Sequence, residues 1–182
     1  MGNTNKNTII FPGLSAEKGW TELKIPDSYG IGKAFITGDR NNDRIKVRYF
    51  KKDSDNSFVA RVWFGPSTEG PPGFVHGGSM AAVLDEAMGA SVWIQGYTAV
   101  SANLTVQYRK MLPLNSITTV EAKITSINQN KIKAEGSIYD ETGALYTESE
   151  GLFINISPEK FKVITKHIDA FQSSLHSKEE SD

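Results

Sequence analysis

A glycine-rich turn followed by two adjacent carboxylates is the part of this sequence whose residue types suit chemistry. The turn ends in His76-Gly77-Gly78 and opens an apolar run with Asp85 and Glu86 near its centre. The first N–H groups of a helix have no partner within the helix, and the helix dipole there favours negative charge. The two glycines would let a developing oxyanion approach these amides closely. They would equally suit chain reversal and tight packing, so both uses stay open.

The two carboxylates point about 100° apart on the predicted helix, so they face different surroundings. Asp85 shares its face with small residues, which leaves room for a substrate or another backbone: Gly78, Ala81, Ala82 and Gly89. A buried carboxylate is costly unless it is paired or used in a reaction. The small face favours Asp85 as the reactive acid, although either acid could instead be a salt-bridged edge residue.

The spacing between Gly78 and Asp85 predicts a site shared by two chains. Seven residues separate them, which is roughly 10 Å along a helix axis. A base must stand about 3 Å from its target, directly or through one water. One helix therefore cannot easily supply both the oxyanion amides and the attacking carboxylate, and we expect a homodimer with the site at its interface.

Three further groups are candidates for contact with a ligand. His76 could cap the turn, touch the ligand or act as a base, and an orienting role is the commonest for a single histidine before a helix. Ser101 lies on the polar face of a predicted strand, where it could hold a water or hydrogen-bond Asp85, or be an ordinary strand serine. Arg109 and Lys110 end that strand, where they could meet phosphates or form a solvated strand end.

Composition excludes several other chemistries. There is no cysteine, so disulfides and thiolate chemistry are ruled out, and a cytoplasmic location is expected. Of three histidines, two lie near the C-terminus, so no metal site and no cofactor is predicted. Phosphate-loop and hydrolase-elbow motifs are missing. A formal net charge of −1 and the lack of a long apolar run argue against nucleic-acid and membrane partners.

Hydrophobic periodicity predicts an α+β domain. Two strands begin at Ile45 and Phe58, a long helix covers about 77–94, and four strands follow within 98–156. Because the helix is apolar all round, the antiparallel sheet should wrap it or a second subunit should cover it. We expect a cap segment over 1–42, with a short helix near Ala16–Leu23, the main domain over 43–157, and a C-terminal helix and polar tail over 158–182.

These residues together resemble the hotdog-fold acyl-CoA thioesterase superfamily, nearest its phenylacetate-pathway-like and mitochondrial long-chain acyl-CoA thioesterase branches. The resemblance rests on His76-Gly77-Gly78, Asp85, the strand Ser101–Lys110 and Pro113-Leu114, and spans about 45–156. It implies six strands around one helix, paired into dimers and often tetramers. One departure is Gly70, because some relatives carry Asn at this place, six residues before the histidine.

The resemblance also implies roles for individual residues. Asp85 corresponds to the nucleophile or general base, and Gly77 and Gly78 to the amides that polarise the thioester carbonyl from the other subunit. Ser101 corresponds to an assisting hydroxyl. His76, Tyr108, Arg109 and Lys110 are the expected contacts to substrate.

The leading hypothesis from the sequence is therefore hydrolysis of an acyl-CoA thioester to a free acid and coenzyme A, without a metal. The main rival is a non-catalytic acyl-CoA-binding or sensing module on the same fold. A hotdog hydratase or dehydratase is a weaker rival, since His76 alone is a credible catalytic histidine and no matching hydratase pattern surrounds it.

Overall fold

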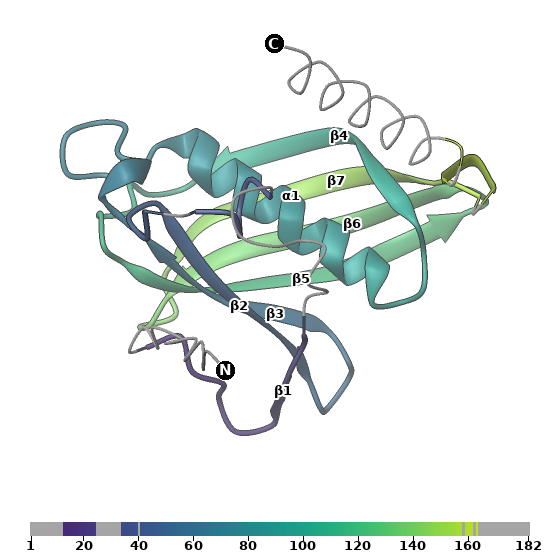
Figure 1. Ribbon diagram of the computed structural model, residues 1–182, viewed down its shortest axis with the longest axis horizontal. Helices are drawn as coiled ribbons and strands as arrows, with labels where there is room; N and C mark the ends of the chain where they lie inside the picture. The colour runs from purple at the N-terminus through teal and green to yellow at the C-terminus, as the bar shows by residue number, and fades with distance from the viewer. Residues whose placement is uncertain (1–12, 25–33, 40, 158, 162, 164–182) are drawn as a thin grey trace, which may run out of the picture.

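One long helix lies across the concave face of a curved antiparallel sheet (Figure 1). The computed structural model describes residues 13–24, 34–39, 41–157, 159–161 and 163. The strands that it describes form one sheet in the order β1-β2-β3-β5-β6-β7-β4. Their bounds are β1 Trp20–Glu22, β2 Ile45–Lys52, β3 Phe58–Phe64, β4 Ala99–Tyr108, β5 Ile117–Asn128, β6 Lys131–Asp140 and β7 Leu145–Asn155. The main helix is α1, Gly77–Trp93, and a short 3-10 turn, η2, covers Pro66–Thr68.

Helix α1 begins and ends where the sequence predicts. His76 is its N-cap, with extended backbone and a ring nitrogen that accepts a hydrogen bond from the helix. At the other end, Gly96 adopts a φ of 87°, a conformation that glycine reaches without strain. The buried positions along the helix are Met80, Val83, Leu84, Ala87, Met88, Ser91 and Val92.

The centre of the sheet has two glycines where helix α1 packs against it. Gly136 on β6 and Gly151 on β7 face α1, and a Cβ atom at either position would come within 3.2 Å of a Met88 atom. Leu84 is fully buried and lies over Gly136. The two glycines therefore let the helix approach the sheet closely, and the apolar side chains around them form one continuous core.

The sheet has seven strands, so the expectation of six is wrong by one. The additional strand is β1, which pairs with the end of β2 from Trp20 opposite Lys52 to Glu22 opposite Phe50. It lies within the segment where a short helix was expected near Ala16–Leu23, and that helix prediction is also wrong. The backbone groups of β1 bond to the edge of β2, and the Trp20 ring packs on Phe50 with centroids 5.8 Å apart. These pairings with a remote strand outweigh a local helix preference.

Residues 13–24, the first described part of the expected cap, lie on the outer face of β2 and β3. Leu14 is buried, and its carbonyl oxygen accepts a hydrogen bond from Arg48. The same guanidinium forms two hydrogen bonds with the Glu22 carboxylate. On β3, Arg61 donates to the Gly13 carbonyl oxygen. The segment is therefore held to the sheet by both apolar and polar contacts, while 1–12, 25–33 and 40 lie outside the described residues.

The remaining predicted elements follow the sequence closely. The turn at Asp140–Gly143 joins β6 to β7, with the Asp140 carboxylate accepting from the Thr142 and Ala144 amides. Of the expected C-terminal helix, residues 159–161 and 163 are helical, and its other positions lie outside the described residues. Within the described ranges, no helix is long and apolar enough to cross a membrane.

Candidate functional site

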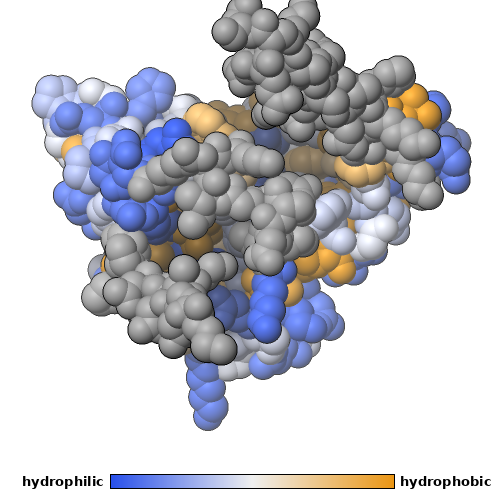
Figure 2. Space-filling model, in the orientation of Figure 1, coloured by the Kyte–Doolittle hydropathy of each residue, from blue (hydrophilic) through white to orange (hydrophobic). Residues whose placement is uncertain are grey.

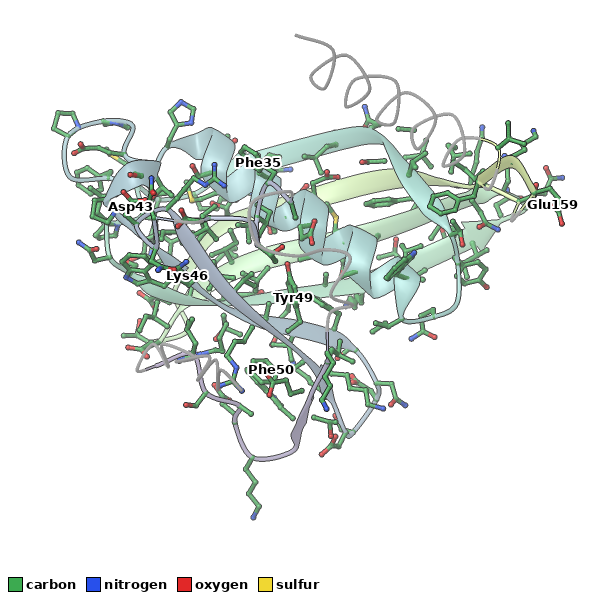
Figure 3. The ribbon with its side chains drawn as sticks, in the orientation of Figure 1. Phe35, Asp43, Lys46, Tyr49, Phe50 and Glu159 are labelled. Carbon is green, nitrogen blue, oxygen red and sulfur yellow. The ribbon has the colours of Figure 1, made fainter. Side chains whose placement is uncertain are left out.

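The fold sends the two central acids of α1 to opposite sides of the helix. Glu86 faces β2, where the Tyr49 hydroxyl donates a hydrogen bond to its Oε1 at 3.1 Å. In Figure 3, Tyr49 points from β2 toward the helix, and Phe50 points the other way. Burial raises the pKa of Glu86, and the negative charge of Asp85 raises it further, although the Tyr49 hydrogen bond acts in the opposite sense. Glu86 is therefore a partnered residue of the β2 side.

Asp85 faces β4 instead, and one of its carboxylate oxygens has no partner in the part of the chain that the structure describes. Oδ1 is buried and accepts no hydrogen bond from the residues that the structure describes. A buried carboxylate oxygen without a donor is costly, and such groups are concentrated at functional sites. The structure thus distinguishes the two acids that the sequence left open, since only Asp85 has an unused buried oxygen.

A cleft of about 350 Å³ lies beside Asp85, between α1 and the first half of β4. Its lining consists of Asp85 with small or polar neighbours: Ala81, Ala82, Ser101, Ala102, Asn103 and Leu104. The small helix residues leave the space open, as the sequence predicts. Asp85 and Ser101 therefore share one cleft, although no hydrogen bond joins their side chains.

Ser101 reaches this cleft because β4 contains a β-bulge. In the pairing with β7, Leu104 lies opposite Gly151 and Asn103 opposite Leu152, but Ser101 already lies opposite Phe153. The register shift at Ala102 adds one residue to β4 and reverses the alternation of its side chains. Directly paired residues share a face of the sheet, and Phe153 is buried against the helix. Strict alternation along the strand predicts that Ser101 and Leu104 lie on opposite faces of the sheet. This prediction is wrong, because the bulge turns Ser101 to the face of Leu104.

The glycine turn lies at the other end of the site, beside the last residue of β4. The Gly78 N–H donates to Nδ1 of His76 at 2.9 Å, so this histidine caps the helix. The hydroxyl of Tyr108 donates to the Gly77 carbonyl oxygen at 3.0 Å. Among the described residues, no acceptor is bonded to the Gly77 N–H. Of the two predicted oxyanion amides, one is thus open and the other is occupied by His76.

Three glycines around this turn have close neighbours where a Cβ atom would stand. A Cβ atom at Gly78 would lie 2.9 Å from His76 Nδ1, and one at Gly77 would lie 3.1 Å from Tyr108 Cζ. At Gly70, a Cβ would lie 2.8 Å from the His76 Cα. An asparagine at position 70 would therefore require His76 to move, so Gly70 fits the present position of the histidine.

The glycine turn and the cleft are two separate parts of one chain. Gly77 and Gly78 do not line the cleft that contains Asp85 and Ser101. Both lie on the same continuous helix as Asp85, and Gly78 precedes Asp85 by seven residues, so the separation of roughly 10 Å along the axis is retained. Strand β4 runs between the two parts, with Ser101 near its start and Tyr108 at its end.

Of the two basic residues expected to meet phosphates, one is already paired. The Arg109 guanidinium bonds to the Glu148 carboxylate of β7. Lys110 is exposed, and its ammonium lies 5.9 Å from the centre of the Tyr146 ring. Lys110 is thus the more available cation at this strand end. Within the described ranges, no group of three or more His, Cys, Asp or Glu side chains could hold a metal ion.

Two residues near the site were not singled out from the sequence. Asn103 lines the cleft and accepts a hydrogen bond from the Thr105 hydroxyl at 3.5 Å. Tyr49 fixes Glu86 from the opposite strand. Asn103 carried a weak signal as a polar residue two positions from Ser101, whereas the contact between Tyr49 and Glu86 joins positions 37 apart and has no local signal.

A long helix wrapped by an antiparallel sheet, with a glycine turn at the helix start, is the arrangement of the hotdog fold. Residues 72–147 match the family model described as Thioesterase superfamily. This match, together with the similar proteins described below, confirms the resemblance to thioesterases inferred from the sequence.

Similar proteins carry related names. The chain is 32% identical over 138 residues to the acyl-coenzyme A thioesterase THEM4 of Xenopus laevis, covering 74% of this chain and 62% of that one. It is 27% identical over 152 residues to human acyl-coenzyme A thioesterase THEM5, covering 76% of this chain and 59% of that one. The BH2602 protein of Bacillus halodurans, solved with CoA, shares 29% identity and a TM-score of 0.54 over 60% of this chain and 73% of that one. The chain spans less than two thirds of the length of the THEM4 and THEM5 relatives.

Proposed function

We propose that this protein hydrolyses an acyl-CoA thioester to a free carboxylic acid and coenzyme A. The observation that carries the proposal is the buried Asp85 Oδ1, which has no hydrogen-bond donor among the described residues and borders an open cleft with Ser101. The names of the relatives, acyl-coenzyme A thioesterases, support this choice of substrate class. So does the CoA in the related Bacillus halodurans structure.

In the proposed reaction, Asp85 acts on water or on the thioester directly. As a general base it takes one proton from a water molecule while the water oxygen bonds to the carbonyl carbon. The carbonyl oxygen gains negative charge, which the open Gly77 N–H of a glycine turn stabilises, and the Gly78 N–H could join it only by leaving His76. The C–S bond then breaks, and the coenzyme A sulfur leaves with the proton held by Asp85. As a nucleophile, Asp85 would first bond to the carbonyl carbon while the C–S bond breaks, giving an anhydride and the coenzyme A thiolate, which takes a proton from water; a second water then hydrolyses the anhydride to the free acid and Asp85. Ser101 orients the water or the carboxylate in either route.

The complete site would combine the cleft of one protomer with the glycine turn of its partner. The outer edge of β4 pairs with no strand among the described residues. Two copies of β4 paired antiparallel about Leu104 would set the partner's Tyr108 beside Val100, next to Ser101. Because Tyr108 touches Gly77, this arrangement would bring the partner's glycine amides toward Asp85. The separation of the two parts within one chain supports this homodimer, with a dimer of dimers as a further assembly.

The residues expected from the sequence to contact substrate remain candidates in this proposal, but Lys110 now ranks above Arg109. His76 and Tyr108 border the glycine turn, where the thioester carbonyl would lie. Lys110 is the first candidate for a phosphate of coenzyme A, since Arg109 would have to exchange its Glu148 partner for the substrate.

A thiol-trapping assay over a panel of acyl-CoA substrates tests this function. Release of free coenzyme A by the wild type, lost in Asp85→Asn without loss of the oligomer, is the expected result. Wild-type turnover retained by Asp85→Asn would refute the role of the aspartate. Binding of acyl-CoA without any thiol release would favour the rival, a non-catalytic binding module. A cytoplasmic location stays a prediction, which imaging of the tagged protein would check.

A further inference from the structure

The peptide group between Gly77 and Gly78, at the start of α1, forms a hydrogen bond with a side chain at its C=O and another at its N–H. The Gly77 carbonyl oxygen and the Gly78 N–H belong to the same planar unit. Tyr108 donates to the carbonyl oxygen at 3.0 Å, and His76 Nδ1 accepts from the N–H at 2.9 Å. Both contacts are close because neither residue has a side chain: a Cβ atom at Gly77 would lie 3.1 Å from the Tyr108 ring, and one at Gly78 would lie 2.9 Å from His76 Nδ1. Two side chains from outside the helix thus fix this peptide plane.

Such a hold matters because consecutive glycines are the most flexible backbone a chain can have. An oxyanion site acts by presenting N–H groups that are already oriented, and a misplacement of about 1 Å can cost about a hundredfold in rate. The two glycines allow a ligand to approach the backbone closely but leave that backbone flexible. The hydrogen bonds from Tyr108 and to His76 restrict this flexibility.

Tyr108 also connects the two parts of the proposed site. It is the last residue of β4, the strand whose first half carries Ser101 into the cleft beside Asp85. About half of the Tyr108 side chain is exposed, so packing into the core does not account for its position. Its one described side-chain hydrogen bond goes to the helix start.

We propose that Tyr108 is a positioning residue of the thioesterase site, whose hydroxyl holds the Gly77–Gly78 peptide so that the open N–H of Gly77, which adjoins this peptide, keeps one fixed orientation. This inference rests on the proposed function. The hydroxyl acts through the backbone of Gly77 rather than on the reacting atoms, and the ring is the part of Tyr108 that borders the expected place of the substrate. Its effect should therefore fall on turnover more than on substrate binding.

The first experiment compares Tyr108→Phe with Tyr139→Phe, a matched change on the outer face of β6. In the acyl-CoA assay, Tyr108→Phe should lower kcat roughly ten- to hundredfold with little change in KM. Tyr139→Phe should retain wild-type kinetics. Both variants should keep the wild-type melting temperature within a few degrees. An unchanged kcat in Tyr108→Phe, with active wild type, would overturn the positioning role and leave the proposed hydrolysis standing.

A second measurement needs no turnover. Amide hydrogen exchange followed by NMR on the ligand-free protein should show the Gly78 N–H exchanging roughly five- to tenfold faster in Tyr108→Phe. Tyr139→Phe should leave that rate unchanged. Equal Gly78 exchange in wild type and Tyr108→Phe would overturn the inference even if no acyl-CoA were hydrolysed, whereas faster exchange without wild-type thiol release would overturn only the function.

A double-mutant cycle separates this hold from simple damage to the turn. Gly77→Ala places a Cβ atom 3.1 Å from the Tyr108 ring and should displace the hydroxyl from the carbonyl. If both changes break the same contact, the kcat of Gly77→Ala with Tyr108→Phe should equal that of the worse single variant. Fully multiplicative losses would contradict the proposal.

Discussion

Ser101 lies directly opposite Phe153 in the pairing of β4 with β7, and both residues face helix α1. The relationship depends on the β-bulge at Ala102, because a regular strand would set Ala102 opposite Phe153 and turn Ser101 outward. The bulge thereby places a hydroxyl in the cleft of Asp85 and turns Val100 to the surface, where 47% of its area is exposed.

Ser101→Ala should lower kcat about tenfold in the thiol-release assay, since a hydroxyl that orients water or Asp85 is lost. Ser137→Ala, on the outer face of β6, is the matched control and should keep wild-type turnover. Equal activities of the two variants would mean that Ser101 is only a strand residue.

Asp85 and Glu86 should respond very differently to the same isosteric change. Asp85→Asn should lower kcat by roughly 10²- to 10⁴-fold, because an amide cannot take the proton from water. Glu86→Gln should retain most of the wild-type kcat, since a Gln carbonyl can still accept the Tyr49 hydrogen bond. Steady-state kinetics on one acyl-CoA substrate measures both, and a larger loss in Glu86→Gln would reverse the assignment.

Glu86→Gln should also change how stability depends on pH. The pKa of Glu86 is raised above its ordinary value near 4.5 in the folded state, mainly by burial. The contribution of the protonated form is thus fully present below the unfolded pKa and is lost as pH rises through the higher folded pKa. Gln cannot ionise, so the variant should be more stable than wild type at neutral pH, and this difference should disappear near pH 4.

Urea unfolding midpoints measured between pH 4 and pH 8 check this dependence. In Tyr49→Phe the stability contributed by protonated Glu86 should be lost at a higher pH than in wild type. The hydrogen bond that favours the ionised carboxylate is absent in the variant, so the pKa of Glu86 should be higher still. A difference between wild type and Glu86→Gln that stays constant over the whole range would contradict the role of ionisation.

Leu84→Ala should destabilise the fold by about 2–5 kcal/mol, because Leu84 is fully buried between α1 and the glycine-lined part of the sheet. Ile127→Ala is the control, since Ile127 is 49% exposed near the end of β5 and should change stability by less than about 1 kcal/mol. Chemical denaturation measures both. A small cost for Leu84→Ala would mean that the helix is not packed against Gly136 as described.

The sequence by itself determined the elements and most of the candidate site. Alternation of apolar residues predicted β2 to β7, and the run after His76-Gly77-Gly78 predicted α1 with Asp85 at its centre. These signals are local, because helix and strand periods are visible within a few residues. The small residues beside Asp85 also indicated where the cleft would open.

Only the tertiary structure decided which groups meet. The β1 pairing, the contact between Tyr49 and Glu86, and the hydrogen bond from Tyr108 to Gly77 all join residues far apart in the chain. The bulge at Ala102 is likewise set by pairing with β7, so alternation along β4 alone gives Ser101 the wrong face. Periodicity reports the environment of a residue along its own element, whereas hydrogen-bond partners and strand register depend on how distant elements pack together.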